Sequence, residues 1–401
     1  MIISLTPART RTVLALLFAG AFIMGCAEML AVGMIDLIAA DLSVSLSAAG
    51  ALVTANALGL AIGGPLLTFA LTSLDRRAVL LGATGVFVLA NLVPVLVPDY
   101  TLFVLARVVI GAVQGLFIAA AMVTATSIVP AERAGRAMAL IIGGFATSSA
   151  VGMPLGTLLG QAAGWRGSFL GVVLIGIAVL VVGLVVLPSV APSGEHRALG
   201  QARHAFAPRV LLVLGVSLLT FAGILAAITY LIPFLDEVTG VDGPAATAYL
   251  LIYGVATAIG SFSGGRFADA NAALTLIVGA IGVTLSLAVL FLFGANALVA
   301  AVSVLGVGVF GMGTAASIQH RVVSLAGPGA PLASSLPASA VNAGIAAGAF
   351  LGGVALDVAG VSAAVLTGTG LAVLAVGAAW ATSVIRAVPV AAASDRVQVA
   401  D

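Results

Sequence analysis

A single carboxylate, Glu28, lies deep in a long apolar run. Between Arg11 and Asp36 the chain carries no other charged side chain, and the run from Thr12 to Ile35 is long enough to cross a membrane. Burying an acid at such a depth costs about 2.5–3.5 kcal/mol on insertion scales, so intramembrane acids generally face a cavity and mark ion or proton pathways. Removal from water disfavours the ionised form, which suits a group that takes up and releases one proton. Alternatively, Glu28 attracts a cationic substrate or is a static, protonated hydrogen-bonding group.

Arg107 is the second charge inside an apolar stretch, residues 101–128. A guanidinium stays ionised in proteins, so it needs acceptors or water, and Glu28 is one candidate partner. The alternative is an ion pair that only holds helices together. Gln114 follows seven residues later on nearly the same helix face and could line a cavity. Asp36 is eight residues beyond Glu28 and is either a charge at the outer end of its helix or a second proton site.

Uncharged polar side chains also occur at membrane depth, and each could join helices or line a substrate site. With Glu28 and Gln114, we take Asn56, Tyr230 and Asn342 as candidates for contacting substrate. The three histidines fall in predicted loops or helix ends without metal-ligand spacing, so we expect neither a metal nor a cofactor. There is no phosphate-binding loop and no nucleophile–base signature, which predicts a protein that is not an enzyme and is not driven by ATP.

The composition requires lipid as the solvent of this chain. Of its 401 residues 62% are hydrophobic and only 7% are charged, and the mean hydropathy is +1.28. Soluble domains are about 25% charged. The net charge of +1 gives no reason to expect nucleic acid as a partner. Cys26 is the single cysteine, so an intramolecular disulfide is excluded.

Charges, prolines and polar clusters divide the chain into twelve predicted spans. They are 12–36, 47–71, 78–97, 101–128, 137–160, 168–188, 210–235, 245–268, 273–293, 297–319, 333–356 and 361–385. All but two of the 15 basic residues fall in alternate loops, the exceptions being Arg107 and Arg166. Because cytoplasmic loops carry the excess of arginine, we expect both termini in the cytoplasm.

The spans repeat as two pseudo-symmetric six-helix halves. "FAG" begins at Phe18 and again at Phe221, and glycine pairs followed by Arg and Asp close the second and eighth spans. We expect an all-α membrane protein with an N-terminal half (1–188), a cytoplasmic linker (189–209), a C-terminal half (210–386) and a cytoplasmic tail (387–401). Transporters are commonly built from such repeats, with the substrate between them.

Glycines four residues apart mark one face of the fifth and eleventh spans. Small residues let helices approach closely in lipid, and we expect these faces at the interface between the halves, where they allow the halves to rock. The residues predicted to serve helix packing and gating are Gly64, Asp75, Arg76, Arg77, Gly143, Gly152, Pro154, Gly156, Arg266, Asp269, Gly344, Gly348 and Gly352.

Several stretches resemble the drug:proton antiporter branch of the major facilitator superfamily, closest to arabinose-efflux and chloramphenicol-resistance-type exporters. They are "ARVVIGAVQG" (106–115), "IGGFATSSAVGMPLGTLLGQAAGWRGSF" (142–169), "YLIPFLDEVTG" (230–240) and "VNAGIAAGAFLGG" (341–353). The resemblance covers nearly the full length and implies alternating access in the plasma membrane of a bacterium. It also implies that Arg107 serves proton transfer and that an acid in the first span serves proton and substrate recognition.

The chain departs from that family pattern at three places. After the second span, Thr68 stands where the family has an aspartate, and the nearest acid is Asp75 beside the arginines. Met153–Pro154 replaces a later Gly-Pro, and Asp36 stands where the branch often has proline. The gating role of the loop aspartate is therefore open in the N-terminal half.

The function predicted from the sequence is proton-coupled export of a small, rather apolar compound, such as a phenicol-type antibiotic. The alternative within transport is a sugar or nucleoside exporter. A remoter alternative is a membrane sensor or scaffold that transports nothing. The expected partners are a small-molecule substrate, protons and the lipid bilayer, and we expect the functional unit to be a monomer.

Overall fold

The computed structural model describes residues 5–191, 203–334 and 336–384, and these residues are helical with no strand among them. Most of the predicted linker and the predicted tail, residues 192–202 and 385–401, lie outside the described residues. Large apolar side chains such as Val185, Phe262 and Leu298 are more than 70% exposed on the outside of the bundle. Such a surface fits hydrocarbon, and the protein is a multi-pass membrane protein.

The N-terminal half is built from helices that begin at recognisable caps. Asp75 caps α5 by accepting from the backbone N–H of Arg77 at 2.9 Å, and Asp99 caps α6 by accepting from that of Leu102 at 2.8 Å. The helices are α1 (Pro7–Gly33), α2 (Ile35–Leu42), α3 (Leu46–Leu58), α4 (Gly64–Ala70), α5 (Arg76–Leu96), α6 (Tyr100–Ser127), α7 (Ala134–Thr147), α8 (Met153–Ala163) and α9 (Trp165–Val186).

The C-terminal half is also built from helices. Its helices are α11 (Pro208–Ile228), α12 (Leu231–Phe234), α13 (Gly243–Phe293), α14 (Ala297–Ala326), α15 (Ala330–Ala333), α16 (Leu336–Ala359) and α17 (Val361–Ser383). α13 has 51 residues, which at 1.5 Å per residue is about 77 Å, far more than a membrane is thick. Non-helical torsions at Asn271 divide it into two arms. The described residues contain eleven candidate spans, so the two arms of α13 complete the predicted twelve.

Prolines shape the second and fifth spans. The π-helical turns η1 (Gly59–Gly63) and η3 (Ser148–Gly152) end directly before Gly64–Pro65 and Met153–Pro154. A proline lacks the N–H that would bond four residues back, so the helix accommodates it with one wider turn. These spans therefore continue across the membrane as α3–η1–α4 and α7–η3–α8.

The glycine faces of the fifth and eleventh spans pack inside the halves. A Cβ on Gly152 or Gly156 would lie 2.2 Å from Cys26 or 2.0 Å from Leu30 of α1. In the other half, a Cβ on Gly344, Gly348 or Gly352 would meet the carbonyl oxygens of Leu218, Ala222 and Ala226 of α11. The expectation that these glycines form the interface between the halves is therefore corrected. Spacing of four identifies a face but not the helix that covers it.

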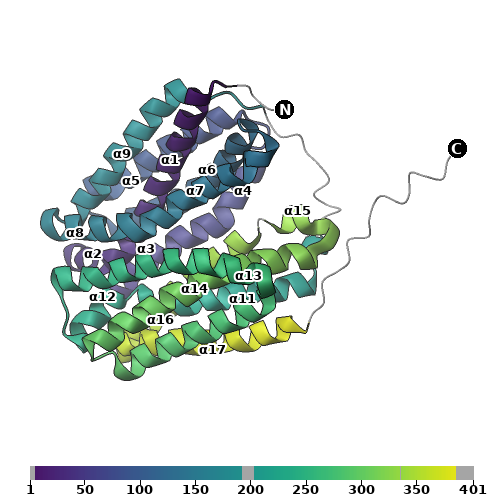
Figure 1. The fold of residues 1–401 in the computed structure, drawn as a ribbon. Coiled ribbons are helices and arrows are strands. Elements are labelled where there is room, and N and C mark those ends of the chain that lie inside the picture. Colours follow the sequence, from purple (N-terminus) through teal and green to yellow (C-terminus); the bar gives the residue numbers. More distant parts are fainter. Residues whose placement is uncertain (1–4, 192–202, 335, 385–401) are drawn as a thin grey trace.

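The two halves lie side by side, with α3 packed on α16 and α8 packed on α13 (Figure 1). Figure 1 shows α2, α12 and the last turn of α8 at one end of the bundle, which we call the α12 end. The start of α1, the end of α4 and α15 lie at the opposite end, which we call the α15 end.

Candidate functional site

Glu28 is at the head of a chain of three polar side chains inside the N-terminal half. Gln114 Nε2 of α6 donates to Glu28 Oε2 of α1 over 2.5 Å. Asn56 Nδ2 of α3 donates to Gln114 Oε1 over 3.5 Å. The exposed fractions are 7% for Glu28, 0% for Gln114 and 1% for Asn56. Of the predicted substrate residues, Gln114 therefore contacts the predicted proton site directly and Asn56 is joined to it through Gln114.

Arg107 lies beside this chain but bonds to the backbone. Its Nη1 donates to the carbonyl of Ala27 over 2.7 Å and its Nη2 to that of Glu28 over 3.3 Å. Its Nε donates to the carbonyl of Leu52 on α3 over 3.2 Å. A carbonyl oxygen has two lone pairs, so these carbonyls can keep their helical bonds and still accept from the guanidinium. The fully buried Arg107 thus joins α6 to α1 and α3.

Among the residues that the structure describes, none forms an ion pair with the Glu28 side chain. Across the described ranges the one ion pair within 4.0 Å is Arg166–Asp41. The sequence analysis considered Arg107 as a partner of Glu28, and the structure instead places Gln114 against the carboxylate. The two helices bring the charges to the same depth, while the guanidinium turns to the α1 backbone. A carboxylate that hydrogen-bonds to a neutral amide can gain or lose a proton without breaking an ion pair.

Asp36 lies apart from this chain, at the α12 end. It is in the first turn of α2, where a carboxylate is stabilised by the helix dipole. A cavity of about 300 Å³ between the halves is lined by Asp36 and by three acids of the other half. The acids of that half are Asp236, Glu237 and Asp242. The structure does not bring Asp36 together with Glu28, so the two predicted proton groups occupy separate places.

Tyr230 is also at the α12 end, at the contact between α3 and α16. Its hydroxyl donates to the carbonyl of Ala349 over 2.9 Å and the side chain is 1% exposed. A Cβ on Gly50 would lie 2.0 Å from this hydroxyl, and one on Gly353 would lie 2.5 Å from it. Tyr230 therefore fills a close contact between the halves, a placement that the sequence analysis did not anticipate.

Further hydrogen bonds join the halves at the α12 end, one between α3 and α16 and two between α8 and α13. Ser47 Oγ at the start of α3 donates to Asp357 Oδ2 near the end of α16 over 2.6 Å. Gln161 Nε2 of α8 donates to Thr247 Oγ1 over 3.0 Å and to the carbonyl of Gly243 over 3.2 Å. The α12 end is thus held closed by side chains that sequence reasoning missed. The glycines around them were a usable signal, but nothing in the sequence pairs α3 with α16.

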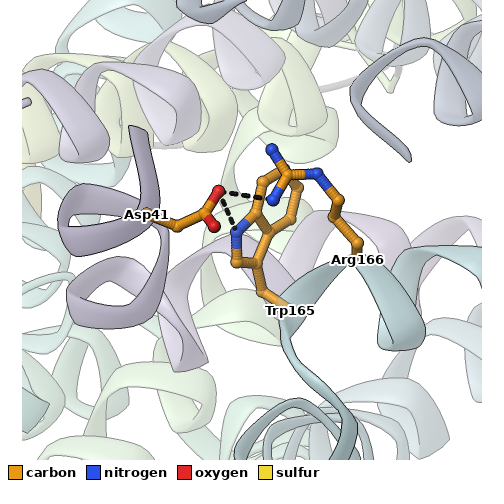
Figure 2. A network of polar contacts seen from close by, with 3 residues as sticks. All are labelled: Asp41, Trp165 and Arg166. Carbon is orange, nitrogen blue, oxygen red and sulfur yellow. Dashed lines mark hydrogen bonds and ion pairs between the residues drawn. The ribbon is translucent and has the colours of Figure 1, made fainter. Parts of the chain in front are cut away.

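The Gly-Trp-Arg sequence at the start of α9 fixes the end of α2. Trp165 Nε1 donates to Asp41 Oδ2 over 3.2 Å, and Arg166 pairs with the same carboxylate (Figure 2). The Arg166 guanidinium lies 4.4 Å from the centre of the Trp165 ring, and that ring stacks on Phe103 of α6 at 5.4 Å. Span 1, span 4 and span 6 are therefore joined just beyond Asp36.

The predicted gating residues of the N-terminal loop lie within one half. Asp75 caps α5 and accepts from Ser189 after α9, and Arg77 bonds to the carbonyl of Leu184. Arg76 donates to the carbonyl of Thr72 over 3.0 Å. These contacts fix the loop to the segment after the sixth span rather than to the other half.

The counterparts in the C-terminal half make fewer contacts. Arg266 and Asp269 are exposed close to the Asn271 kink.

Asn342 donates to the carbonyl of Ala338 over 2.9 Å, and its buried Oδ1 has no hydrogen-bond partner among the described residues. Asn342 is not joined to the Glu28 chain.

Comparison with known proteins identifies the family. Residues 17–331 match the Major Facilitator Superfamily. The chain belongs to this superfamily. The inner membrane transport protein YdhP of Escherichia coli K12 is 31% identical over 341 residues, 84% of this chain and 87% of that protein. The chloramphenicol resistance protein of Streptomyces lividans is 30% identical over 335 residues, 81% of this chain and 84% of that protein.

The superfamily fold is also found among solved structures. A bacterial homologue of the human lysosomal transporter Spinster, crystallised in an inward-facing and unoccupied conformation, has a TM-score of 0.79. It is 15% identical, and the alignment covers 94% of this chain and 98% of that chain. The predicted twelve-helix fold and the resemblance to chloramphenicol-resistance-type exporters are confirmed.

Proposed function

We propose that this superfamily member is a proton-coupled exporter of a small, rather apolar compound, such as a phenicol-type antibiotic, and that Glu28 is its proton-coupling group. One observation carries the proposal: the Glu28 carboxylate is buried within a membrane span, is bonded to the amide of Gln114 and forms no ion pair with any described residue. A buried acid without a counter-ion is sensitive to its protonation state, because burial disfavours charge while a donated N–H stabilises it.

The conformation supports a direction for the proton. The halves are held together at the α12 end by Ser47–Asp357 and by Gln161–Thr247. The arginine-rich loops of the sequence fall at the α15 end, which we assign to the cytoplasm. In that orientation the structure is closed to the outside, as in the inward-facing Spinster homologue. Donation from Gln114 then stabilises ionised Glu28 in the state that releases its proton inward.

One relative and the polar groups support an apolar substrate over a sugar or nucleoside. A sugar site needs several polar groups free to bond the ligand. Asn56 and Gln114, which would serve such a site, instead bond to one another and to Glu28 and are buried. A relative is a chloramphenicol resistance protein, so chloramphenicol is the first compound to test.

Resistance of expressing cells tests the proposal. Bacteria lacking their own efflux pumps would express the wild-type protein or Glu28→Gln and be exposed to a panel of phenicols, other apolar antibiotics, lipophilic cations and sugar analogues. We expect the wild type to raise the tolerated concentration of at least one apolar compound. An uncoupler should abolish the difference in accumulation of that compound between cells with and without the transporter. A panel in which only sugar analogues respond would favour the alternative substrate class.

A further inference from the structure

The chain from Glu28 through Gln114 to Asn56 has a direction set by its hydrogen atoms. In the present arrangement Gln114 gives its N–H to Glu28 and offers its carbonyl oxygen to the N–H of Asn56. The Oδ1 atom of Asn56 is buried and no described residue donates to it. The side-chain amide of Asn56, which is 1% exposed, therefore makes one long hydrogen bond through Nδ2, while its Oδ1 accepts none from the described residues.

Protonation of Glu28 allows the donor at the head of the chain to change from Gln114 to Glu28. A neutral carboxyl keeps one carbonyl oxygen as an acceptor but gains an O–H, and Gln114 accepts from this O–H when its amide turns over. The turned amide then presents N–H to Asn56, which can accept only with Oδ1. The nitrogen and oxygen of an amide are nearly equal in size, so each reversal needs only rotation of the terminal amide. The proton itself stays on Glu28, and no bond is made or broken beyond its O–H.

Asn56 transmits this reversal to the helix that faces the other half. Two residues before it, Thr54 Oγ1 donates across the interface to the carbonyl of Ala346 over 3.3 Å. On its other side, a Cβ on Gly111 of α6 would lie 2.0 Å from the Asn56 carbonyl oxygen, so α3 and α6 are in close backbone contact there. After reversal, Asn56 would place its NH₂ where Oδ1 now lacks a partner. A buried N–H without an acceptor is destabilising, so the hold of α6 on α3 weakens.

We propose that Gln114 and Asn56 are positioning residues that relay the protonation state of Glu28 to α3, and through α3 to the contact between the halves. This relay rests on the proposed role of Glu28 as proton site and adds the route by which the proton moves the halves. The ionised state keeps α3 on α6 in the conformation closed at the α12 end. The protonated state releases it.

The other groups around Glu28 do not offer a competing route. Arg107 of α6 is the charged side chain next to the turn of α1 that carries Glu28. It bonds to backbone carbonyls of that turn, which do not change when the Glu28 side chain is protonated. The polar side chains that η3 and α8 bring against α1 are Ser148 and Thr157, and both are uncharged. The remaining charges on helices that pack against α1 lie toward the ends of the bundle: Asp36, Asp41, Arg76, Arg77, Arg136 and Arg166.

The relay can be tested on the full protein in proteoliposomes without a known substrate. Infrared spectroscopy would follow the carboxyl band of Glu28 against pH, assigned by its loss in Glu28→Gln. Spin labels on Ala70→Cys and His320→Cys, in a Cys26→Ala background, would report the separation of the halves at the α15 end. In the wild type we expect the separation to change with the same midpoint pH as the infrared band.

Asn56→Leu removes the last link of the relay at similar volume. We expect the Glu28 band still to titrate while the spin-label separation loses its pH dependence. Asn91→Leu is the matched control, because Asn91 is equally buried, also has an unpartnered Oδ1, and bonds only to the carbonyl of Phe87. It should keep the wild-type pH response. If Asn56→Leu does not accumulate, Gln114→Leu removes the middle link and should give the same loss.

Two outcomes would overturn the relay, and they are distinct. If Asn56→Leu or Gln114→Leu keeps the wild-type pH response while Glu28 titrates, the relay is wrong and the proposed proton site stands. If Glu28 shows no titration in the wild type, the proton site and the relay both fail.

Discussion

Gln114 Nε2 lies 2.5 Å from Glu28 Oε2, so an amide rather than a guanidinium is the direct partner of the buried carboxylate. Arg107, the nearby cation, donates instead to the α1 carbonyls of Ala27 and Glu28. The sequence allowed an ion pair between Glu28 and Arg107. In the structure these two residues instead have different direct partners. In the proposed relay Gln114 responds to the charge of the acid, while Arg107 bonds to the backbone of the helix that carries it.

Replacing Arg107 should affect coupling and stability together. Arg107→Ala removes hydrogen bonds to three carbonyls on two helices, which we expect to lower the free energy of unfolding by about 1–3 kcal/mol. Uphill transport should be lost although the protein still inserts. Arg107→Lys should restore it only partly, because an ammonium lacks the planar fork that reaches α1 and α3 at once. Thermal unfolding in detergent and transport in proteoliposomes measure the two effects, and full transport by Arg107→Ala would leave this residue a packing role only.

A methyl group on Gly348 should separate two helices of the C-terminal half. Its Cβ would lie 2.2 Å from the carbonyl oxygen of Ala222, which belongs to backbone and cannot move aside. We expect Gly348→Ala to destabilise the protein by about 1–3 kcal/mol through overpacking. Gly370→Ala is the control, since nothing lies within 4 Å of a Cβ there. Equal melting temperatures for the two variants would show that α16 does not need this close approach.

The hydrogen bonds at the α12 end should decide how often that end opens. Asp357→Ala removes the acceptor of Ser47, and Gln161→Ala removes the donor to Thr247. Each such bond contributes about 0.5–1.5 kcal/mol. The double variant should therefore raise the open population severalfold, seen as a longer distance between spin labels on Ala163→Cys and Ala359→Cys. Glu132→Gln changes an exposed acid away from this contact and should leave the distance unchanged. An unchanged distance distribution in the double variant would mean that these two hydrogen bonds do not hold the α12 end closed.

Membrane orientation can be measured from single cysteines in a Cys26→Ala background. The arginine distribution places residue 200 in the cytoplasm, although it lies outside the described residues. A cysteine at Gly200 should react with a membrane-impermeant maleimide only after permeabilisation, whereas one at Ala295, between α13 and α14, should react in intact cells. The reverse labelling pattern would show that the protein has the opposite orientation in the membrane and that the proposed proton path runs in the opposite direction.

The spans were predictable because each is an apolar run of membrane length, and Glu28 and Arg107 stood out because each is a lone charge in such a run. The two arms of α13 correspond to the predicted spans 245–268 and 273–293, and the Asn271 kink falls in the short loop expected between them. Partner choice was harder to predict. Depth along two helices predicts that Glu28 and Arg107 are near one another, but rotation about the helix axes decides that Gln114 meets the acid.

Contacts between the halves could not be predicted from the sequence, for a different reason. Ser47 and Asp357 are 310 residues apart in the chain, and their pairing depends on the register of α3 against α16. Nothing local encodes that register. The same holds for Tyr230, which was predicted to contact substrate and instead fills the gap beside Gly50. Small residues next to these positions were the available signal.

The most direct test of the central claim is uphill transport by Glu28→Gln in proteoliposomes with an imposed pH gradient. Chloramphenicol would be the first probe, followed by any compound to which expressing cells become resistant. Glutamine keeps the size of the side chain and can still bond to Gln114, but it cannot exchange a proton. We predict that the variant exchanges an uncharged substrate down its gradient, at a rate near that of the wild type, and loses accumulation against the gradient together with substrate-dependent proton movement. Undiminished uphill transport with unchanged proton movement would contradict the account and move the search for the proton site to Asp36.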